Sequence, residues 1–513
     1  IRLFKLCIMK LSLKIYLLPI LISLSSCQFL DKFPDSNADV RIDSKEKIKE
    51  LLTGAYPKSS YFRFLEMRTD NVGDKRNSLE ASRLDESMFY WKDYDEEEPD
   101  SPKAYWMECY RGISQANQAL EVLAGFSDKH DPQIQALYAE ALLIRAYLHF
   151  MIANIWAPPY QGEEDSKNLP GIVYVESPEK NALVKYKMDN LADTYRKIER
   201  DLRLGLAWVR DDFYDQVKYH FNKKAAYAFA VRFFSYTGQW QEVIDYSAYV
   251  LGQQPAKAIT AFLNISDLQT DERTAYYASE QNPSNLLLTV TESLWYKYYV
   301  DGRFGLDEPT FQRVVGRSGA KTLYQIAGYN KMAKHTGSNS VYFPKFFHFN
   351  NAEGLLNSKR GHFCMNVLFT TEEVLLHRAE AYAMLENKEL ALNDIVTFFL
   401  AKHVTAKGVG EAPEREELDF IPTSDRDRIQ PYYRPLSASQ ASLLFVISEM
   451  SRQQFMHEGL RWFDLRRFNM SVDRNQTGDV RNVNWVLKPE DSRKYLPFPS
   501  EAINYIEKIN YND

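Results

Sequence analysis

Apolar side chains recur at three- and four-residue spacing along much of the chain, and this period is typical of amphipathic α-helices. The pattern is strongest from Tyr105 to Leu123 and from Ile134 to Trp156, and Pro158-Pro159 ends the second run. A later run is divided at Thr237-Gly238 into two antiparallel helices. The predicted helices lie within residues 48–56, 105–123, 134–156, 188–209, 222–251, 371–401 and 443–468. The sequence therefore predicts a mainly α-helical protein.

Several of these runs pair into helical hairpins of the kind found in tetratricopeptide repeats. Ala379, Tyr382 and Ala391 hold the relative offsets that such repeats use for small and aromatic packing residues. The period is too irregular for an uninterrupted array. We therefore expect a scaffold of stacked helix pairs with long irregular loop excursions and few short strands, one of them over Asn285–Thr291.

Four long stretches lack a helical period, at about residues 59–104, 157–187, 255–370 and 403–435. The last three hold most of the glycine and proline, together with many asparagines and tyrosines. Loops held by a rigid scaffold are where binding residues usually lie. We therefore expect the ligand at the loop-rich excursions over 59–104 and 255–370.

The segment from Met9 to Pro34 has the pattern of a secretory signal with a lipobox. Two lysines precede an apolar run of about ten residues, half the length that crosses a bilayer, and Leu24-Ser25-Ser26-Cys27 closes it. Several acyl chains on Cys27 would anchor a folded domain stably. An ordinary cleaved signal with an incidental cysteine is the alternative. The expected parts are a signal peptide over 1–26, of which 1–8 precede the true start, a lipidated tether over 27–40 and a single domain over 41–513.

Composition narrows the classes of function. A formal net charge of −6 without a basic block argues against nucleic-acid binding. Aromatic residues make up 14% of the chain, and tyrosine and tryptophan rings make flat contact surfaces for ligands as well as core. No HExxH motif, zinc-spaced cysteine pair, GxSxG motif or glycine-rich phosphate loop occurs, so we expect neither an enzyme nor a bound cofactor.

Two further features leave alternatives open. Cys109 and Cys364 are either two buried free thiols, the favoured interpretation, or one disulfide. The acidic stretch Asp93–Ser101 is dense in hard oxygen ligands that suit calcium. It lacks the glycine and the spacing of a known calcium loop, so a solvated charged loop is favoured.

The last quarter of the chain carries the most distinctive residues. Ser437 and Gln440 form the pattern of a capping box, and the helix that they open is expected to continue through Gly459 to Phe468. Residues three apart on such a helix can form one ladder of charge pairs. These residues are Glu458, Arg461, Asp464 and Arg467.

Six groups of residues, in the same order along the chain, resemble the SusD/RagB-like outer-membrane lipoproteins of Bacteroidetes. The matching residues are Cys27 with Phe29-Leu30-Asp31 and Pro34; Trp106, Tyr110, Ile113, Ala116 and Asn117; Ala141, Arg145, Ala146, Tyr147 and Phe150; Glu373, Leu375, Arg378, Ala379, Glu380 and Ala381; Glu458-Gly459 with Arg461-Trp462 and Asp464-Leu465-Arg466; and Tyr495-Leu496-Pro497 with Pro499.

The resemblance implies a cell-surface binding protein, lipid-anchored in the outer membrane and facing the cell exterior. Members of the family capture oligosaccharide or polysaccharide and deliver it to a SusC-like TonB-dependent transporter. A minority of them handle peptides. The resemblance further implies that the ligand-binding aromatic residues lie in variable loops, so no binding residue can be carried over by motif.

The binding residues are therefore predicted from the chemistry of sugars. A sugar ring presents an apolar C–H face and a rim of hydroxyls, so its site needs exposed tryptophan or tyrosine planes beside polar side chains. Two stretches supply both kinds of residue. The predicted ligand-binding residues are Asp70, Asn71, Arg76, Tyr90, Trp91 and Tyr94 in the first, and Trp295, Tyr298 and Arg303 in the second.

Two other functions stay open beside glycan capture. One is peptide capture for the same kind of transporter, and the other is a helical-repeat scaffold that binds a protein partner. Adjacent aromatic residues can also serve only to pack the excursions onto the scaffold. Alanine substitution of Trp91 and Trp295 distinguishes a glycan site at these residues from mere packing.

Overall fold

The computed structural model describes residues 42–507 except 77–80, 181–183, 317–325, 338, 351–360, 406–407, 416–420, 433–434 and 475–484. The chain divides into two units, residues 1–48 and 49–513. The expected signal peptide, the tether and Cys27 lie outside the described residues. All structural statements below on packing and on cavities concern the second unit.

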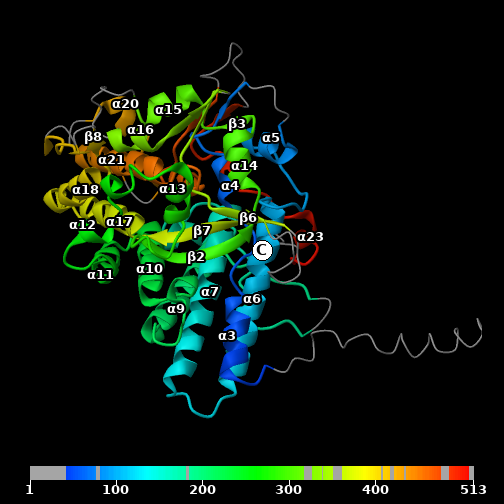
Figure 1. The fold of residues 1–513 in the computed structure, drawn as a ribbon. Helices are drawn as coiled ribbons and strands as arrows, with labels where there is room; N and C mark the ends of the chain where they lie inside the picture. Colours follow the sequence, from blue (N-terminus) through cyan, green and yellow to red (C-terminus); the bar gives the residue numbers. More distant parts are fainter. Residues whose placement is uncertain are drawn as a thin grey trace, which may run out of the picture. The chain divides into compact units, whose positions relative to one another are not determined.

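The predicted helical scaffold is confirmed (Figure 1). Side chains that precede the helices accept hydrogen bonds from their first free N–H groups, as at Ser101, Asp131, Asn190 and Asn222. The predicted hinge at Gly238 has φ of 72° and closes α10 in a left-handed turn. The scaffold helices are α6 (Pro102–Ala124), α7 (Pro132–Trp156), α9 (Leu191–Trp208), α10 (Lys223–Thr237), α11 (Trp240–Leu251), α17 (Thr371–Met384), α18 (Lys388–Lys402) and α21 (Ala438–Gln454).

Helix α7 is the core of this scaffold. By length and composition it could cross a membrane, but 94% of its most apolar window is buried inside the protein. Buried ion pairs then tie the helices together across the core. Arg145 joins α7 to Asp201 of α9, with 2.6 Å between Nε and Oδ2, and Arg232 joins α10 to Glu373 of α17. Pairs of this kind specify how the helices meet more than they stabilise the fold.

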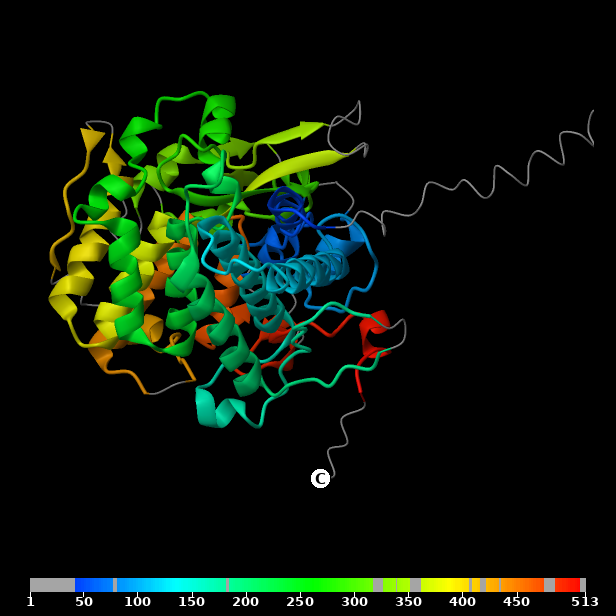
Figure 2. The same cartoon turned by 90° about the horizontal axis from the view of Figure 1, so that it is seen from below.

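A three-stranded antiparallel sheet lies against the helices, in the order β2 (Asn285–Glu292), β7 (His362–Thr370), β6 (His348–Asn350). The strand predicted over 285–291 is confirmed. Seen from below, the sheet and the carboxyl-terminal segment lie on opposite sides of α6 and α7 (Figure 2). Thr370 ends β7 and also caps α17, because its Oγ1 accepts a hydrogen bond from Glu373 N. Sheet and hairpin are therefore joined without a linker.

Shorter elements complete the chain around this frame. Among the helices are α3 (Lys45–Thr53), α4 (Phe62–Glu66), α5 (Arg83–Phe89), α14 (Trp295–Asp301), α15 (Glu308–Val314), α22 (Leu460–Arg467) and α23 (Ser500–Ile503). Among the strands are β1 (Gly73–Asp74), β3 (Phe304–Gly305), β10 (Val472–Asp473) and β11 (Val486–Leu487). Cys109 and Cys364 are both buried and unpaired, which confirms the free thiols.

The continuous helix expected through Gly459 is wrong. The capping box at Ser437 is present, but α21 ends at Gln454 and the chain turns at Gly459, where φ is 73°. A Cβ atom at Gly459 would lie 2.9 Å from the Cβ of Leu65, so only glycine suits this close approach.

The single charge ladder expected on that helix is also wrong, because the turn sends its members to different partners. Glu458 pairs with Lys345, Arg461 with Asp70 and Glu449, and Arg467 with both Glu380 and Asp464. Only the pair between Asp464 and Arg467 follows the expected three-residue spacing.

Candidate functional site

A polar cleft of about 590 Å³ lies where the first excursion meets α21 and the chain after α22. Phe89 and Phe445 supply its aromatic surface. Such a volume and a convergence of polar groups are typical of ligand sites. Its charged lining residues are Arg313, Arg428, Arg452 and Arg474 with Asp70, Glu449 and Asp473. We call this cavity the polar cleft.

Asp70 is the centre of the cleft's charge network. The guanidinium of Arg461 donates two hydrogen bonds to the Asp70 carboxylate, at 2.9 Å (Nε to Oδ1) and 3.0 Å (Nη2 to Oδ2). Arg452 and Arg428 lie 3.3 and 3.5 Å from Oδ2. Burial alone would raise the pKa of Asp70, but Arg452 and Arg461 hold this pKa well below its usual range. The carboxylate therefore stays charged at every physiological pH.

Asn71, the neighbour of Asp70, is fully buried and belongs to the floor beneath the cleft. Its amide donates to Glu66 Oε1 at 3.1 Å, and its oxygen accepts from Arg452 Nε at 2.8 Å. Glu66 also accepts from the backbone N–H groups of His457 and Gly459. Burial raises the pKa of Glu66 to about 7 in spite of these bonds. This floor fixes Arg452 in place before any ligand arrives.

Arg474 holds the loop that carries Asp70. Its guanidinium donates to the carbonyl oxygens of Val72 at 2.6 Å, Met67 at 2.8 Å and Thr69 at 3.1 Å. The same group lies 3.8 Å from the ring centroid of Phe89, in a cation–π contact. Burial lowers the pKa of Arg474 to about 9. The side chain of Arg474 therefore holds the backbone of this loop in position.

The excursions over 59–104 and 255–370 meet beside the polar cleft. We call this meeting point the rim and define it by Asp74, Tyr90, Arg303 and Trp485. β1 pairs with β3, so that Asp74 lies opposite Phe304. Arg303 forms a two-contact ion pair with Asp74, at 3.1 and 2.8 Å. Tyr90 packs 5.4 Å from Trp485, and both rings are half-buried. This rim offers partly exposed ring planes beside charged groups.

The structure separates the other predicted residues. Arg76 lies next to the rim, exposed, with φ of 52°. Tyr94 donates to Glu98, and Tyr298 lies under the guanidinium of Arg63 at 3.8 Å. Neither tyrosine lines the polar cleft. Of the nine predicted side chains, Asp70, Asn71, Arg76, Tyr90 and Arg303 are brought to the cleft, its floor or its rim.

The expectation that Trp91 and Trp295 present exposed rings is wrong. Trp91 is 3% exposed and Trp295 is 1% exposed. Trp91 Nε1 donates to Arg68 O at 2.9 Å, and Trp295 Nε1 donates to His457 O at 2.8 Å. Each ring satisfies its polar atom inside the protein, so both tryptophans pack the excursions onto the scaffold.

Sequence reasoning missed several residues of the site. Of these residues, only Trp485 could have been identified from the sequence, because it is a lone tryptophan in a polar stretch between two family-like motifs. The arginines Arg428 and Arg474 lie more than 350 residues from Asp70 in the chain, and nothing in their local sequence indicates this contact.

Comparison with known proteins agrees with this architecture. Residues 28–234 match a SusD-like family described as starch-binding and associating with the outer membrane. No curated protein matches. A SusD superfamily protein from Bacteroides thetaiotaomicron is 16% identical with a TM-score of 0.65, and the match covers 90% of this chain and 99% of that one.

Two further solved structures carry names that refer to sugars. A putative sugar binding protein from Bacteroides vulgatus is 15% identical, with a TM-score of 0.66 and coverage of 92% and 100% of the two chains. A SusD-like carbohydrate binding protein from the same species is 16% identical, with a TM-score of 0.63 and coverage of 92% and 100%. The family match over residues 28–234 and the fold shared with these solved structures agree with the resemblance drawn from the sequence: residues 28–234 are similar to the SusD-like family, and the chain has the fold of SusD superfamily proteins.

Proposed function

We propose that this chain is a lipid-anchored protein of the outer cell surface that captures an oligosaccharide at the polar cleft and its rim. From there it passes the sugar to a SusC-like TonB-dependent transporter. The observation that carries the proposal is the meeting of Tyr90 and Trp485 with Asp74, Arg303 and the arginine-lined cleft. The family description of starch binding at the outer membrane supports it.

The chemistry of the site suits a sugar. The partly exposed faces of Tyr90 and Trp485 can stack on the C–H face of a pyranose ring. Arginine offers several N–H donors in a fixed fork, and bonds from a charged donor are stronger than neutral ones. Arg428 has a side chain that is 33% exposed, lies 3.5 Å from Asp70 and stands over the ring of Phe445 at 5.7 Å from its centroid. Arg428 is therefore able to turn toward a ligand hydroxyl.

The site is built to bind rather than to react. Asp70 and Glu449 are each neutralised by buried arginines, so neither acts as the paired acid and base of a glycosidase. A preorganised site loses little side-chain entropy on binding. Energy for transport would come from the transporter, and capture needs only reversible affinity.

The test is binding of the protein, expressed from Gln28 onward, to a panel of plant, microbial and host polysaccharides, followed by affinity electrophoresis and calorimetry. We expect one glycan class to bind and the double variant Tyr90→Ala/Trp485→Ala to weaken it by about 10-fold or more, on the order of 1–3 kcal/mol for lost ring stacking. Tyr249→Ala is the matched control, since this tyrosine is 65% exposed on α11.

Glycan binding that survives both the rim variant and Arg428→Ala would contradict the proposed site. Binding of peptides alone, with no glycan retarded, would favour the peptide alternative over the glycan.

A further inference from the structure

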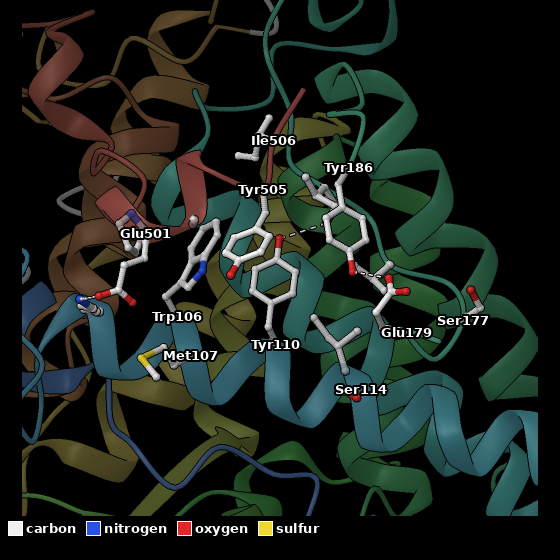
Figure 3. A pocket seen from close by; sticks show the side chains of 16 residues that line it. Trp106, Met107, Tyr110, Ser114, Ser177, Glu179, Tyr186, Glu501, Tyr505 and Ile506 are labelled. Carbon is white, nitrogen blue, oxygen red and sulfur yellow. Dashed lines mark hydrogen bonds and ion pairs between the residues drawn. The ribbon is translucent and has the colours of Figure 1, made fainter. Parts of the chain in front are cut away.

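A second cavity, of about 430 Å³, lies on the opposite side of α6 from the sheet, under the carboxyl-terminal segment. Trp106 and Tyr110 rise from α6, Tyr186 comes from the strand-like segment before α9, and Tyr505 comes down from the residues after α23 (Figure 3). Trp106 and Tyr110 are neighbours on the helix, with ring centroids 4.9 Å apart, and Tyr186 and Tyr505 line the same cavity. We call this cavity the aromatic pocket.

The walls of the aromatic pocket are fixed by hydrogen bonds from several segments. Tyr110 donates to Val173 O at 3.0 Å, and Asn117 donates to Val175 O at 3.0 Å, so the extended chain over 173–177 is held on α6. On the other side, Tyr186 N donates to Tyr505 O at 2.8 Å and Glu507 N donates to Tyr186 O at 2.9 Å. The pocket is therefore formed before a ligand arrives.

The rings themselves are suited to an organic cation. Aromatic faces carry negative partial charge, and a guanidinium or ammonium group over them is attracted, most of all where water is excluded. Trp106 packs 4.9 Å from Tyr110, while Tyr505 is 50% exposed at the mouth. Arginine adds planar stacking to this attraction, which lysine cannot.

The charges around the pocket favour the same kind of ligand. Glu179 and Glu501 line the mouth, and both are exposed. Asp95 of the acidic excursion lies near Glu501, because it accepts from Ser500 N at 3.3 Å. Of the described residues that line the pocket, Lys103 is the only cation, and it is paired with Glu501 at 2.8 Å. The described lining residues thus carry two carboxylates and one lysine, and Glu179 also accepts from the hydroxyl of Tyr186 at 2.7 Å.

The mouth also exposes apolar side chains. Met107 and Tyr505 are 44% and 50% exposed there. Scattered apolar residues on a surface are ordinary, but a cluster around a concave site indicates a binding surface. A peptide with an arginine between apolar residues matches the rings, the carboxylates and the exposed apolar side chains together.

We infer that the aromatic pocket is a second binding site, separate from the polar cleft, that takes an arginine side chain of a basic peptide segment. The arginine lies against the rings of Trp106, Tyr110 and Tyr505 that line the pocket, with Glu179 and Glu501 near its charge. An apolar neighbour of the arginine covers Met107.

The test uses fluorescence anisotropy of the protein from Gln28 onward with two labelled pentapeptides, Gly-Leu-Arg-Leu-Gly and Gly-Leu-Glu-Leu-Gly. We expect the arginine peptide to bind at least about 10-fold more tightly than the glutamate peptide, because the aromatic faces and the carboxylates both favour a cation. Tyr505→Ala should weaken the arginine peptide by about 3- to 30-fold. Glu179→Gln/Glu501→Gln should weaken it by about 3-fold and reduce its salt dependence.

Two controls separate this site from folding and from the polar cleft. Tyr249→Ala, and the rim variant Tyr90→Ala/Trp485→Ala, should leave arginine-peptide affinity unchanged. Because Tyr505 is half exposed, Tyr505→Ala should keep the denaturation midpoint of the parent protein. Equal affinity for both peptides, no binding of the arginine peptide at millimolar concentration, or unchanged affinity in Tyr505→Ala would overturn the inference. So would loss of glycan binding in Tyr505→Ala, since the pocket would then belong to the glycan site.

Discussion

The polar cleft and the aromatic pocket are held in shape by different kinds of interaction. In the cleft, shape depends on buried charges: Arg461, Arg452 and Arg474 hold Asp70 and the backbone around it. In the pocket, shape depends on rings and on backbone hydrogen bonds, and the charged groups stand at the mouth. The comparison teaches that one scaffold can carry a site whose integrity needs its ion pairs and another that does not.

The largest expected effect comes from removing the central arginine of the cleft. Arg461→Met leaves Asp70 and Glu449 buried without their main partner, and breaking a buried pair in this way costs about 3–5 kcal/mol of the free energy of unfolding. Urea denaturation followed by circular dichroism measures it. The control Arg210→Met removes a surface pair with Asp212 and should leave the denaturation midpoint where it was.

If Arg461→Met abolishes glycan binding while the arginine peptide still binds to the folded fraction, the two sites are independent. If glycan binding and peptide binding both fall when the folded fraction is unchanged, then Arg461 supports both sites, not only the polar cleft.

The next largest effect should be a loss of folding stability at acidic pH. The folded-state pKa of Asp70 lies well below its value in the unfolded chain, so its contribution to stability is present above about pH 4 and is lost as pH falls below that. We expect the parent protein to lose on the order of 2 kcal/mol through this one group on going toward pH 2. Asp70→Asn should be less stable at pH 7 and should show a flatter profile over pH 2–4. Urea titrations at several pH values measure both, and parallel profiles for the two proteins would refute the assignment.

The smallest effect should be at the mouth of the aromatic pocket. Lys103→Met removes the one lysine among the described residues that line it and leaves Glu501 without this pair. We expect an unchanged denaturation midpoint, because the pair lies on the surface, and arginine-peptide binding that is about 2-fold tighter, because a like charge has gone. Weaker peptide binding in Lys103→Met would show that Lys103 serves the ligand rather than opposing it.

The helices were predictable because burial repeats locally along each of them. The hairpin at Gly238, the strand over Asn285–Glu292 and the cap at Ser437 all follow from neighbours within a few residues. The break at Gly459 was not predictable from periodicity, because it depends on the close approach of Leu65, almost 400 residues away. Tertiary contact overrides helical period there.

The candidate site was only partly predictable for the same reason. Tyr90 and Arg303 stand in stretches rich in rings and charges, and those stretches do meet. Yet composition cannot distinguish a ring that faces solvent from one whose indole N–H finds a carbonyl in the core, and Trp91 and Trp295 are of the second kind. The arginines of the cleft come from the far end of the chain and join it only through the fold.

Thr370 has a consequence of another kind. The last residue of β7 is also the cap of α17, and no flexible linker separates the two elements. A distortion of the sheet therefore also distorts the start of α17. The amide protons of β7 and α17 should therefore exchange with solvent through a single opening event, as one cooperative unit with one free energy.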